Sequence, residues 1–315
     1  MNWDAPEIAA LVRAALHEDI RAGDATAQAL VPPTATARAR IIAKQEVIVA
    51  GLPLAAQVFR ALDAAIAFTA RQHEGAALRK GDLLAEISGS AAAILSGERT
   101  ALNFLAHLCG IATQTRRFVE ALAGTRTRIR DTRKTTPLLR ALEKYAVRTG
   151  GGTNHRFGLY DAILIKENHI AMAGGVKPAM DRAHAFAART SPAAREMTAY
   201  EAYRSPGNDP AGAARDSGVL PIQIEVRNEE ELREALHCGA EAVLLDNQTT
   251  VEAARLVSIA RGIRPDCVIE ISGGITLANA HAYAEAGADF LSSGALTHSA
   301  PAADLSLLVE THSGE

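Results

Sequence analysis

Residues 222–247 read IQIEVRNEEELREALHCGAEAVLLDN and contain one complete unit of a parallel α/β fold. The apolar run at 222–226 has the length of a buried strand, and a second such run follows at 242–245. The amphipathic segment between them predicts a helix that Asn228 caps and Gly239 ends. A strand, a helix and a strand in this order predict two parallel strands joined by a helical crossover.

The same alternation occupies most of the chain beyond Gly124. Strand-like apolar runs are separated by helical patterns such as TLANAHAYAEAG, which Thr276 caps and Gly287 ends. The runs lie at 162–165, 222–226, 242–245, 267–271 and 290–291. Repeated strand and helix units predict a TIM-like α/β barrel, in which the carboxyl ends of the strands converge on one mouth.

The first hundred residues mix helical and strand-like patterns, which is typical of a small α+β domain. We expect a helix at 6–18, an alternating strand at 37–49 and short strands near 83–87. A helical spacing of apolar residues then begins at Ser96, which has the chemistry of an N-cap, and continues to Gly124 as one or two linking helices.

The length of 315 residues exceeds the usual size of one domain and favours a large domain with a smaller partner. We therefore expect an N-terminal α+β sandwich domain at 1–108 and an α/β-barrel domain at 109–298. The C-terminal tail, 299–315, could join the first domain. The segment 190–218 is rich in Pro, Gly and Ala and predicts a loop, to which we assign no chemistry.

The composition excludes several classes of protein. The net charge is -3 at pH 7, so there is no global positive field to bind nucleic acid or an anionic membrane. Long apolar runs are missing, and the opening MNWDAPEIAA lacks the basic and apolar regions of a signal peptide, so we expect a cytoplasmic protein that binds no membrane. Cys109, Cys238 and Cys267 form no CxxC pair and are expected to be core thiols.

Polar residues lie at or just past the points where the predicted strands end. These residues are Lys166, Glu225, Asp246, Ser272 and Ser293. Because the strands of a barrel end at one mouth, we expect these side chains to form a single site.

A basic stretch from 126 to 156 contains nine Lys or Arg residues and only two acids. It predicts an anion site, because guanidinium groups bind carboxylates through paired hydrogen bonds. The residues that we assign to this site are Arg133, Lys134, His155 and Arg156. A solvated helix face is the alternative for them, and it is our interpretation of three cations spaced four residues apart, Arg140, Lys144 and Arg148.

Glu225 and Asp246 end neighbouring predicted strands, in the sequences IEV and LLDN. Two carboxylates about 4 Å apart repel each other by about 4 kcal/mol at an effective dielectric constant of about 20, so a cation is expected to join them. Mg²⁺ together with a phosphorylated substrate suits such a pair. The alternative is that each acid forms a salt bridge with a nearby Lys or Arg.

Two glycine-containing turns, ISGGIT and SSGALTHS, follow the last two predicted strands. Backbone N–H groups in turns after late barrel strands commonly bind phosphate, since glycine lets the backbone approach closely. The candidate ligands are Ser272, Gly273, Gly274, Ser293, Gly294 and His298. The alternative is a pair of tight turns between strand and helix that bind nothing.

Several of these segments resemble one known family. The stretches DTRKTTP, GGGTNHRFGLYDAILIKENHI, IEV, LLDN, SGGI and GALTHS are similar to quinolinate phosphoribosyltransferase, also called nicotinate-nucleotide pyrophosphorylase (carboxylating). LHEDIRAGDAT and AKQEVIVAG are similar to its N-terminal domain. The resemblance implies that quinolinate and phosphoribosyl pyrophosphate (PRPP) react with Mg²⁺ to give nicotinate mononucleotide, pyrophosphate and carbon dioxide for NAD synthesis.

The resemblance also implies roles for individual residues. The residues that would bind the substrate carboxylates and nearby phosphates are Arg99, Arg133, Lys134, His155, Arg156 and Lys166. Those with catalytic roles are Lys134, Lys166, Glu225 and Asp246, and the last two would also hold the magnesium. In this family the arginine that matches Arg99 comes from the neighbouring subunit of a dimer. The resemblance therefore implies a homodimer or a higher homo-oligomer with shared sites. Leu138 departs from the family, which usually has glycine at this position.

Two other kinds of function remain open from the sequence. One is a paralogue of the same fold, either the pyrophosphorylase-like protein found with molybdate transport or a transferase for a mono-acid pyridine that does not decarboxylate. It would need fewer cations than this chain has. The other is a non-catalytic phosphate-binding barrel. Glu225 and Asp246 argue against it, because added negative charge hinders anion binding.

Overall fold

The computed structural model describes residues 1–190 and 220–310, which divide into two compact units. The N-terminal unit comprises Met1–Gln114 with Ala300–Glu315, and the barrel unit comprises Thr115–Ser299. The sequence-based division lay at 108/109 and at 298/299. The loop expected at 190–218 lies outside the described residues, apart from Thr190, which ends helix α7 (Val176–Thr190).

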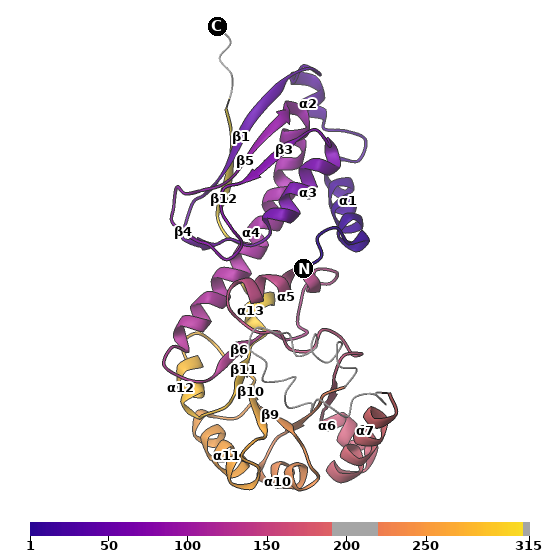
Figure 1. Cartoon of the computed structure of the whole chain (residues 1–315), viewed down its shortest axis with the longest axis vertical. Coiled ribbons are helices and arrows are strands. Elements are labelled where there is room, and N and C mark those ends of the chain that lie inside the picture. Colours follow the sequence, from indigo (N-terminus) through magenta and orange to yellow (C-terminus); the bar gives the residue numbers. More distant parts are fainter. Residues whose placement is uncertain (191–219, 311–315) are drawn as a thin grey trace. The chain divides into compact units, whose positions relative to one another are not determined.

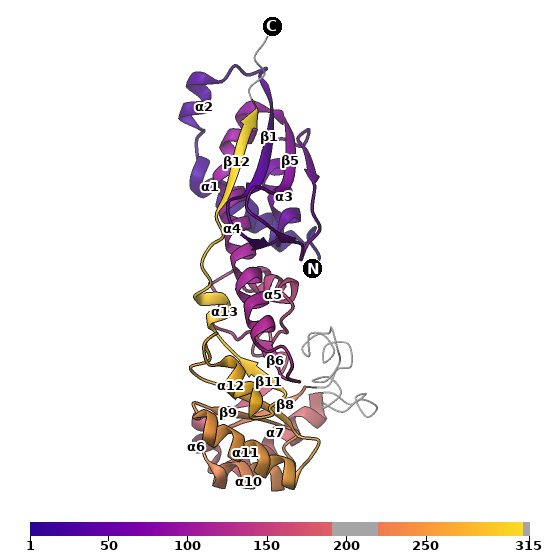
Figure 2. The same ribbon diagram turned by 90° about the vertical axis from the view of Figure 1, so that its left-hand side faces the viewer.

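The N-terminal unit is built on a four-stranded antiparallel sheet in the order β12-β1-β5-β3, of which Figure 2 labels β12, β1 and β5 and Figure 1 also labels β3. The strands are β1 (Thr36–Ala43), β3 (Ala67–Ala70), β5 (Leu83–Ser90) and β12 (Leu305–Glu310). In β1, Ala39 and Ile41 are buried whereas Arg38 and Arg40 are exposed, so one face of the sheet is covered and the other is open. Because β12 pairs with β1, the C-terminal segment completes this unit.

Three helices and a strand pair also belong to the N-terminal unit. They are α1 (Pro6–Ile20), α2 (Ala25–Leu30), α3 (Leu52–Leu62), and β2 (Val47–Ile48) paired with β4 (Ala77–Leu78). The helix predicted at 6–18 and the strand predicted at 83–87 are confirmed. The strand predicted at 37–49 is divided into β1 and β2, because the chain bends at 44–46. The smaller α+β domain is therefore present.

A single helix, α4 (Ala91–Ala121), follows β5 without a loop. The prediction that Ser96 caps this helix is wrong, because Ser96 lies in the second turn and donates its hydroxyl to Asp24 Oδ2 at 3.0 Å. Ser90 acts as the cap, since its Oγ accepts a hydrogen bond from the Ala93 N–H at 3.3 Å. Three alanines follow this cap, and their high helix propensity lets the helix begin where the strand ends.

The barrel unit contains six parallel strands in the order β6-β11-β10-β9-β8-β7. The strands are β6 (Arg128–Arg130), β7 (Ile163–Ile165), β8 (Ile222–Val226), β9 (Ala242–Asp246), β10 (Val268–Ser272) and β11 (Phe290–Ser292). The sequence predicted all of them except β6. That strand was missed because Arg128 and Arg130 interrupt its apolar character.

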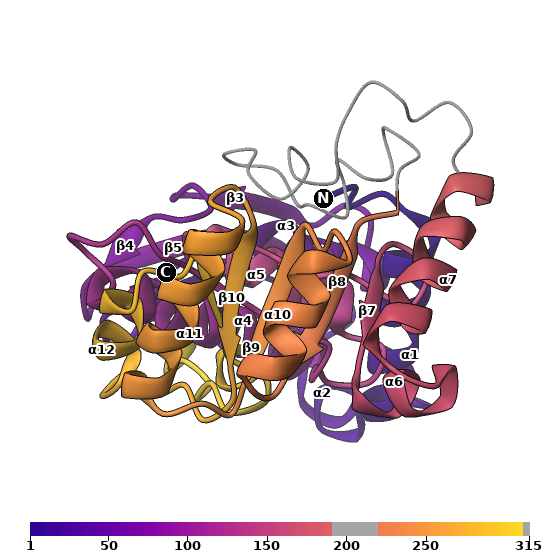
Figure 3. The same ribbon diagram turned by 90° about the horizontal axis from the view of Figure 1, so that it is seen from below.

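Helices surround the strands of the barrel unit (Figures 1 and 3). They are α5 (Arg140–Thr149), α6 (Glu167–Ala173), α7, α10 (Glu229–His237), α11 (Thr250–Ile263), α12 (Ala280–Glu285) and α13 (Ala295–His298). The predicted cap of α10 is confirmed, because Asn228 accepts a hydrogen bond from the Glu231 N–H. The predicted cap at Thr276 is wrong. A turn over 276–279, in which Asn279 Oδ1 accepts the Thr276 N–H, delays α12 to Ala280.

The predicted α/β-barrel class is confirmed, with a curved parallel sheet of six strands. Among residues 1–190 and 220–310, no hydrogen-bonded pair joins β7 to β6. A single parallel bridge between Arg130 and Thr153 extends the sheet beyond β6. The six strands therefore still direct their carboxyl ends to one side of the unit.

The two ends of the strands differ in polarity. Ala242, Val268 and Phe290, which begin β9, β10 and β11, form a buried cluster. The same strands end at Asp246, Ser272 and Ser292. The apolar core thus fills the amino ends of the strands, whereas polar groups gather at the carboxyl ends, where barrel enzymes place their active sites.

Two further expectations concern membranes and cysteines. In the part of the chain that the structure describes, every helix is too short or too polar to cross a bilayer. Cys109 and Cys267 are buried as predicted, and burial raises the pKa of each thiol to about 12. Cys238 is partly exposed and is not a core thiol.

Candidate active site

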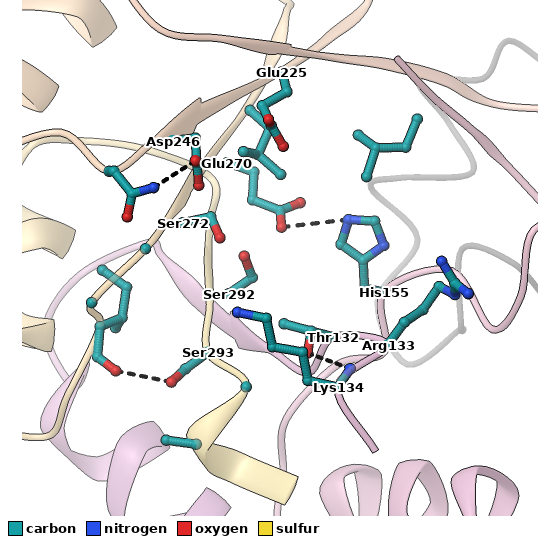
Figure 4. Close-up of a pocket in the computed structure, with 18 of the residues that line it drawn as sticks. Thr132, Arg133, Lys134, His155, Glu225, Asp246, Glu270, Ser272, Ser292 and Ser293 are labelled. Carbon is teal, nitrogen blue, oxygen red and sulfur yellow. Dashed lines mark hydrogen bonds and ion pairs between the residues drawn. The ribbon is translucent and has the colours of Figure 1, made fainter. Parts of the chain in front are cut away.

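A cavity of about 610 Å³ opens at the carboxyl ends of the six parallel strands (Figure 4). The predicted site residues that line it are Arg133, Lys134, His155, Arg156, Lys166, Glu225, Asp246, Ser272, Gly273, Gly274, Ser293, Gly294 and His298. Each strand contributes at least one of these residues, either from its last positions or from the loop that follows. The structure therefore brings together groups that are more than 160 positions apart in the sequence.

Arg99 does not line this cavity. It lies on α4 in the N-terminal unit and is exposed to solvent. A single copy of the barrel unit thus supplies every predicted site residue except Arg99.

Two arginines enter the cavity from different loops, Arg133 after β6 and Arg156 after the Thr153 bridge. Arg133 Nε is buried and has no hydrogen-bond partner within the described residues. Arg156 Nη1 donates to the Ala162 carbonyl oxygen at 3.1 Å, which orients this guanidinium. Arg133 and Lys134 lie across the cavity from Glu225 and Asp246 (Figure 4). The side of the cavity that contains Arg133 and Lys134 is therefore suited to anionic groups.

The prediction for the basic face of α5 is correct only for Arg148, which is exposed. Lys144 is buried and binds the buried carboxylate of Asp131. Arg140 donates to the Phe157 carbonyl oxygen at 3.1 Å and is partly buried. The prediction of a solvated face is wrong for Arg140 and Lys144, because α5 packs these two side chains against the loops that line the cavity. Their hydrogen bonds hold those loops in place.

Glu225 and Asp246 lie on neighbouring strands and face the cavity. Glu225 accepts a hydrogen bond from Lys166 Nζ at 2.7 Å, and Asp246 accepts one from Asn247 Nδ2 at 2.7 Å. The salt-bridge alternative therefore holds for Glu225 in this structure. Across the two described ranges, no cluster of three or more His, Cys, Asp or Glu could hold a metal. Glu225 and Asp246 could thus supply only part of a coordination shell.

Glu270 is a cavity residue that the sequence analysis missed. It lies in the middle of β10, fully buried, and its Oε2 accepts hydrogen bonds from Arg130 Nη1 and Gln223 Nε2, both at 3.1 Å. Burial alone would raise the pKa of Glu270, but electrostatic interactions with His155 and Arg130 and hydrogen bonds from Gln223 and Ser292 hold it below its ordinary value. The available clue was an acid inside an apolar strand, VIEIS.

His155 lies 3.6 Å from Glu270, measured between Nε2 and Oε1. Burial lowers the pKa of His155 to about 4, although the carboxylate of Glu270 acts in the opposite direction. Nδ1 accepts the Arg156 N–H at 2.7 Å, so the neutral ring carries its proton on Nε2. His155 was predicted to belong to the anion site, and it does line the cavity, but burial keeps its ring uncharged at pH 7.

The neutral state of His155 predicts a pH dependence of stability. As pH falls from 6.5, the ordinary pKa of His, towards 4, the unfolded chain binds a proton that the folded protein excludes. The free energy of unfolding is expected to fall by on the order of 3 kcal/mol between pH 6.5 and pH 4. Below pH 4, His155 is expected to cause no further loss of stability. Urea denaturation of wild type and of His155→Gln at several pH values isolates this contribution. Equal slopes for both proteins would contradict the prediction.

The turn after β10 requires glycine at position 273. Gly273 has φ +95°, and a Cβ there would lie 2.1 Å from Asn247 Oδ1 and 2.9 Å from Asn247 Cα. Gly274 has φ +63° and open space on its side-chain face. Both glycines thus adopt conformations that side chains disfavour, and they leave backbone exposed to the cavity.

Ser293 connects the two glycine turns. It is buried, and its hydroxyl donates to the Ile275 carbonyl oxygen at 2.9 Å. This hydrogen bond holds the loop after β11 against the loop after β10. Ser293 lines the cavity, but its hydroxyl hydrogen is already used within the protein.

Leu138 adopts a left-handed backbone conformation, which glycine tolerates more readily than leucine does. Its φ is +68° and its side chain is 89% exposed. The left-handed conformation costs a leucine about 1–2 kcal/mol, and no packing of the exposed side chain offsets this cost. The turn after Lys134 therefore contains a left-handed residue even though that residue is leucine.

The fold and this cavity define a class of protein, an α/β-barrel enzyme for anionic, phosphorylated substrates. The family model described as "Quinolinate phosphoribosyl transferase, C-terminal domain" matches residues 111–205 and 212–308. The corresponding N-terminal domain model matches residues 24–109. The chain belongs to the quinolinate phosphoribosyl transferase family, as its motifs predicted, and is a phosphoribosyltransferase.

Individual relatives agree with this assignment. The nicotinate-nucleotide pyrophosphorylase [carboxylating] of Mycobacterium leprae is 39% identical over 304 residues, covering 94% of this chain and 95% of that protein. The crystal structure of NadC from Streptococcus pyogenes has a TM-score of 0.82 at 35% identity, over 97% of this chain and 98% of that one. The nicotinate-nucleotide pyrophosphorylase from Francisella tularensis has a TM-score of 0.82 at 36% identity, over 98% of both chains.

Proposed function

We propose that this chain transfers the phosphoribosyl group of PRPP to quinolinate and releases carbon dioxide, giving nicotinate mononucleotide for NAD synthesis. The observation that carries this proposal is the shared cavity. Arg133 and Arg156 face the same space as Glu225, Asp246 and the glycine turns after β10 and β11. A dianionic pyridine and a polyphosphate require these kinds of group together.

The chemistry explains why the site needs no nucleophilic side chain. The lone pair of the pyridine nitrogen forms the bond to ribose C1, while the bond from C1 to the pyrophosphate oxygen breaks. The cationic ring then accepts the electron pair of the bond to the adjacent carboxylate, carbon dioxide departs, and a proton takes its place. Catalysis depends on positioning the reactants and on stabilising the departing pyrophosphate, roles that we assign to Lys134 and Lys166.

The remaining groups have binding roles in this proposal. Arg133 and Arg156 bind the two carboxylates of quinolinate through paired hydrogen bonds. The neutral His155 donates from Nε2 rather than contributing charge. The groups that hold the 5-phosphate of ribose are Ser272, Gly273, Gly274, Ser293, Gly294 and His298, with Ser293 acting through its position and backbone.

Glu225 and Asp246 are the proposed magnesium ligands. The donor set fits, since Mg²⁺ prefers carboxylate oxygens and takes its other ligands from substrate phosphates and water. When bound, the metal would neutralise charge on the pyrophosphate. Lys166 holds Glu225 at 2.7 Å, so this lysine also positions the carboxylate.

A turnover assay tests the function against its alternatives. Purified protein is incubated with Mg²⁺, PRPP and either quinolinate or nicotinate, and carbon dioxide, pyrophosphate and mononucleotide are measured. Quinolinate should give all three products. Nicotinate turnover without carbon dioxide would favour the non-decarboxylating paralogue, and binding without products would favour a phosphate-binding barrel.

We also propose a homodimer in which Arg99 completes the site of the neighbouring subunit. Arg99 is exposed on α4, as a residue that acts in another subunit must be in the isolated chain. An equimolar, randomly reassorted mixture of Arg99→Ala and Lys134→Ala subunits is expected to recover about one quarter of wild-type activity, because about half of the dimers are mixed and one of their two sites is intact. No recovery in mixed dimers that are verified by mass would contradict shared sites.

A further inference from the structure

A buried ion pair lies behind the wall of the cavity. Asp131 follows β6 directly and is fully buried, and Lys144 in α5 is 2% exposed. Lys144 Nζ binds Asp131 Oδ1. Neither side chain lines the cavity, so the roles assigned above do not use this pair.

The ion pair holds the loop that carries His155 and Arg156. The His155 N–H donates to Asp131 Oδ1 at 2.8 Å, and the His155 carbonyl oxygen accepts from Lys144 Nζ at 2.9 Å. Asn154 Nδ2 donates to Asp131 Oδ2 and, at 3.0 Å, to the Lys144 carbonyl oxygen. Both polar backbone groups of His155 are therefore bound by charged partners.

We propose that Asp131 and Lys144 are positioning residues for quinolinate binding, because they set the separation between the two arginine-bearing loops. This inference rests on the proposed function of Arg133 and Arg156. Arg133 lies two residues after Asp131, and Arg156 lies one residue after His155. A shift of the ion pair therefore moves one arginine relative to the other. A rigid di-acid requires both to be placed correctly at once.

Stability alone is a poor explanation for these charges. Desolvation of a buried ion pair often cancels its attraction, and apolar residues of similar volume stabilise a core equally well. The ion pair instead fixes the orientation of the peptide groups at His155. The Lys144 ammonium donates to the His155 carbonyl oxygen, and the Asp131 carboxylate accepts from the His155 N–H. Two differently charged partners fix the orientation of this peptide segment.

The test compares two double variants that each remove a charge pair. Asp131→Asn/Lys144→Met removes both charges of the proposed pair, so that neither remains buried alone. The matched control is Asp289→Asn/Arg261→Met. Asp289 binds Arg261 at 2.7 Å and also accepts a backbone N–H at 2.8 Å, but it precedes β11, at the amino ends of the strands. Calorimetry gives the Kd of quinolinate and of PRPP, and thermal unfolding gives the Tm.

The Kd of quinolinate is expected to rise at least about 30-fold in Asp131→Asn/Lys144→Met, whereas the Kd of PRPP changes less than about threefold. The control should change both constants less than about threefold, even though its Tm also falls. A quinolinate Kd within about threefold of wild type in the folded Asp131→Asn/Lys144→Met variant would overturn the proposal.

A second measurement needs no substrate. The variant Asp131→Glu keeps the negative charge but displaces the carboxylate group. If Asp131→Asn/Lys144→Met does not fold, Asp131→Glu is used in the binding test in its place. Hydrogen exchange of the His155 amide in the ligand-free protein should be at least about tenfold faster in Asp131→Glu than in wild type. Unchanged exchange would count against the positioning role. Quinolinate binding to the wild-type protein is measured separately. If the wild-type protein itself binds no quinolinate, the proposed function fails, and this outcome is distinct from a failure of the positioning role.

Discussion

Replacing Arg133 with Ala is expected to raise the KM for quinolinate by about 100-fold and to leave the KM for PRPP within about threefold of wild type. Arg133 lines the cavity on the side opposite Glu225 and Asp246, so its guanidinium group is placed to bind a substrate carboxylate. Two charge-assisted hydrogen bonds in a partly desolvated pocket contribute about 3 kcal/mol, which corresponds to this loss. Steady-state kinetics with each substrate varied in turn measures it.

Two controls separate geometry from charge. Arg133→Lys keeps the charge without the planar pair of donors, and is expected to lose about tenfold in KM for quinolinate. Arg148→Ala removes an exposed arginine of the same basic stretch and should have no effect. Unchanged quinolinate kinetics in both Arg133→Ala and Arg156→Ala would refute the assignment of the di-acid to this side of the cavity.

Asp246→Asn is expected to lower kcat/KM for PRPP by about 1,000-fold and to raise the Mg²⁺ concentration needed for half-maximal activity. The substitution keeps the size of the side chain and its hydrogen bond to Asn247 can re-form, but the negative charge that attracts the cation is lost. Activity is measured over a magnesium titration at fixed PRPP, with quinolinate binding measured in parallel.

Asp266→Asn provides the matched control, because Asp266 has a side chain that is 60% exposed and lies outside the cavity. It should behave as wild type throughout the titration. An Asp246→Asn enzyme with normal PRPP kinetics and an unchanged magnesium requirement would contradict the proposed metal site. Loss of quinolinate binding instead would show that this carboxylate supports the other substrate.

The barrel could be predicted from the sequence because each strand and helix is indicated by a pattern of residues that are close together in the chain. Runs such as 222–226 or 242–245 have the length of a strand, have a polar residue at or just past their ends, and are followed by a helix with recognisable ends. The carboxyl ends of parallel strands must lie on one side, so Glu225 and Asp246 were placed together without knowledge of any distance. The cavity that contains both follows from this topology.

The sequence could not predict which polar side chains are buried by residues that are distant in the chain. A spacing of four residues places Arg140, Lys144 and Arg148 along one helix, but it does not reveal that only Arg148 faces solvent. The neutral state of His155 likewise depends on its burial, and no feature next to it in the chain reveals that. Glu270 was passed over because its neighbours in the strand are apolar.

In the proposed complex, this cavity binds quinolinate with its two carboxylates against Arg133 and Arg156. A crystal structure of the protein with bound quinolinate tests it most directly. We expect a pyridine ring in the cavity, with one carboxylate within hydrogen-bond distance of Arg133 and the other within hydrogen-bond distance of Arg156. A ring bound outside the cavity, or one whose carboxylates face Glu225 and Asp246, would contradict it.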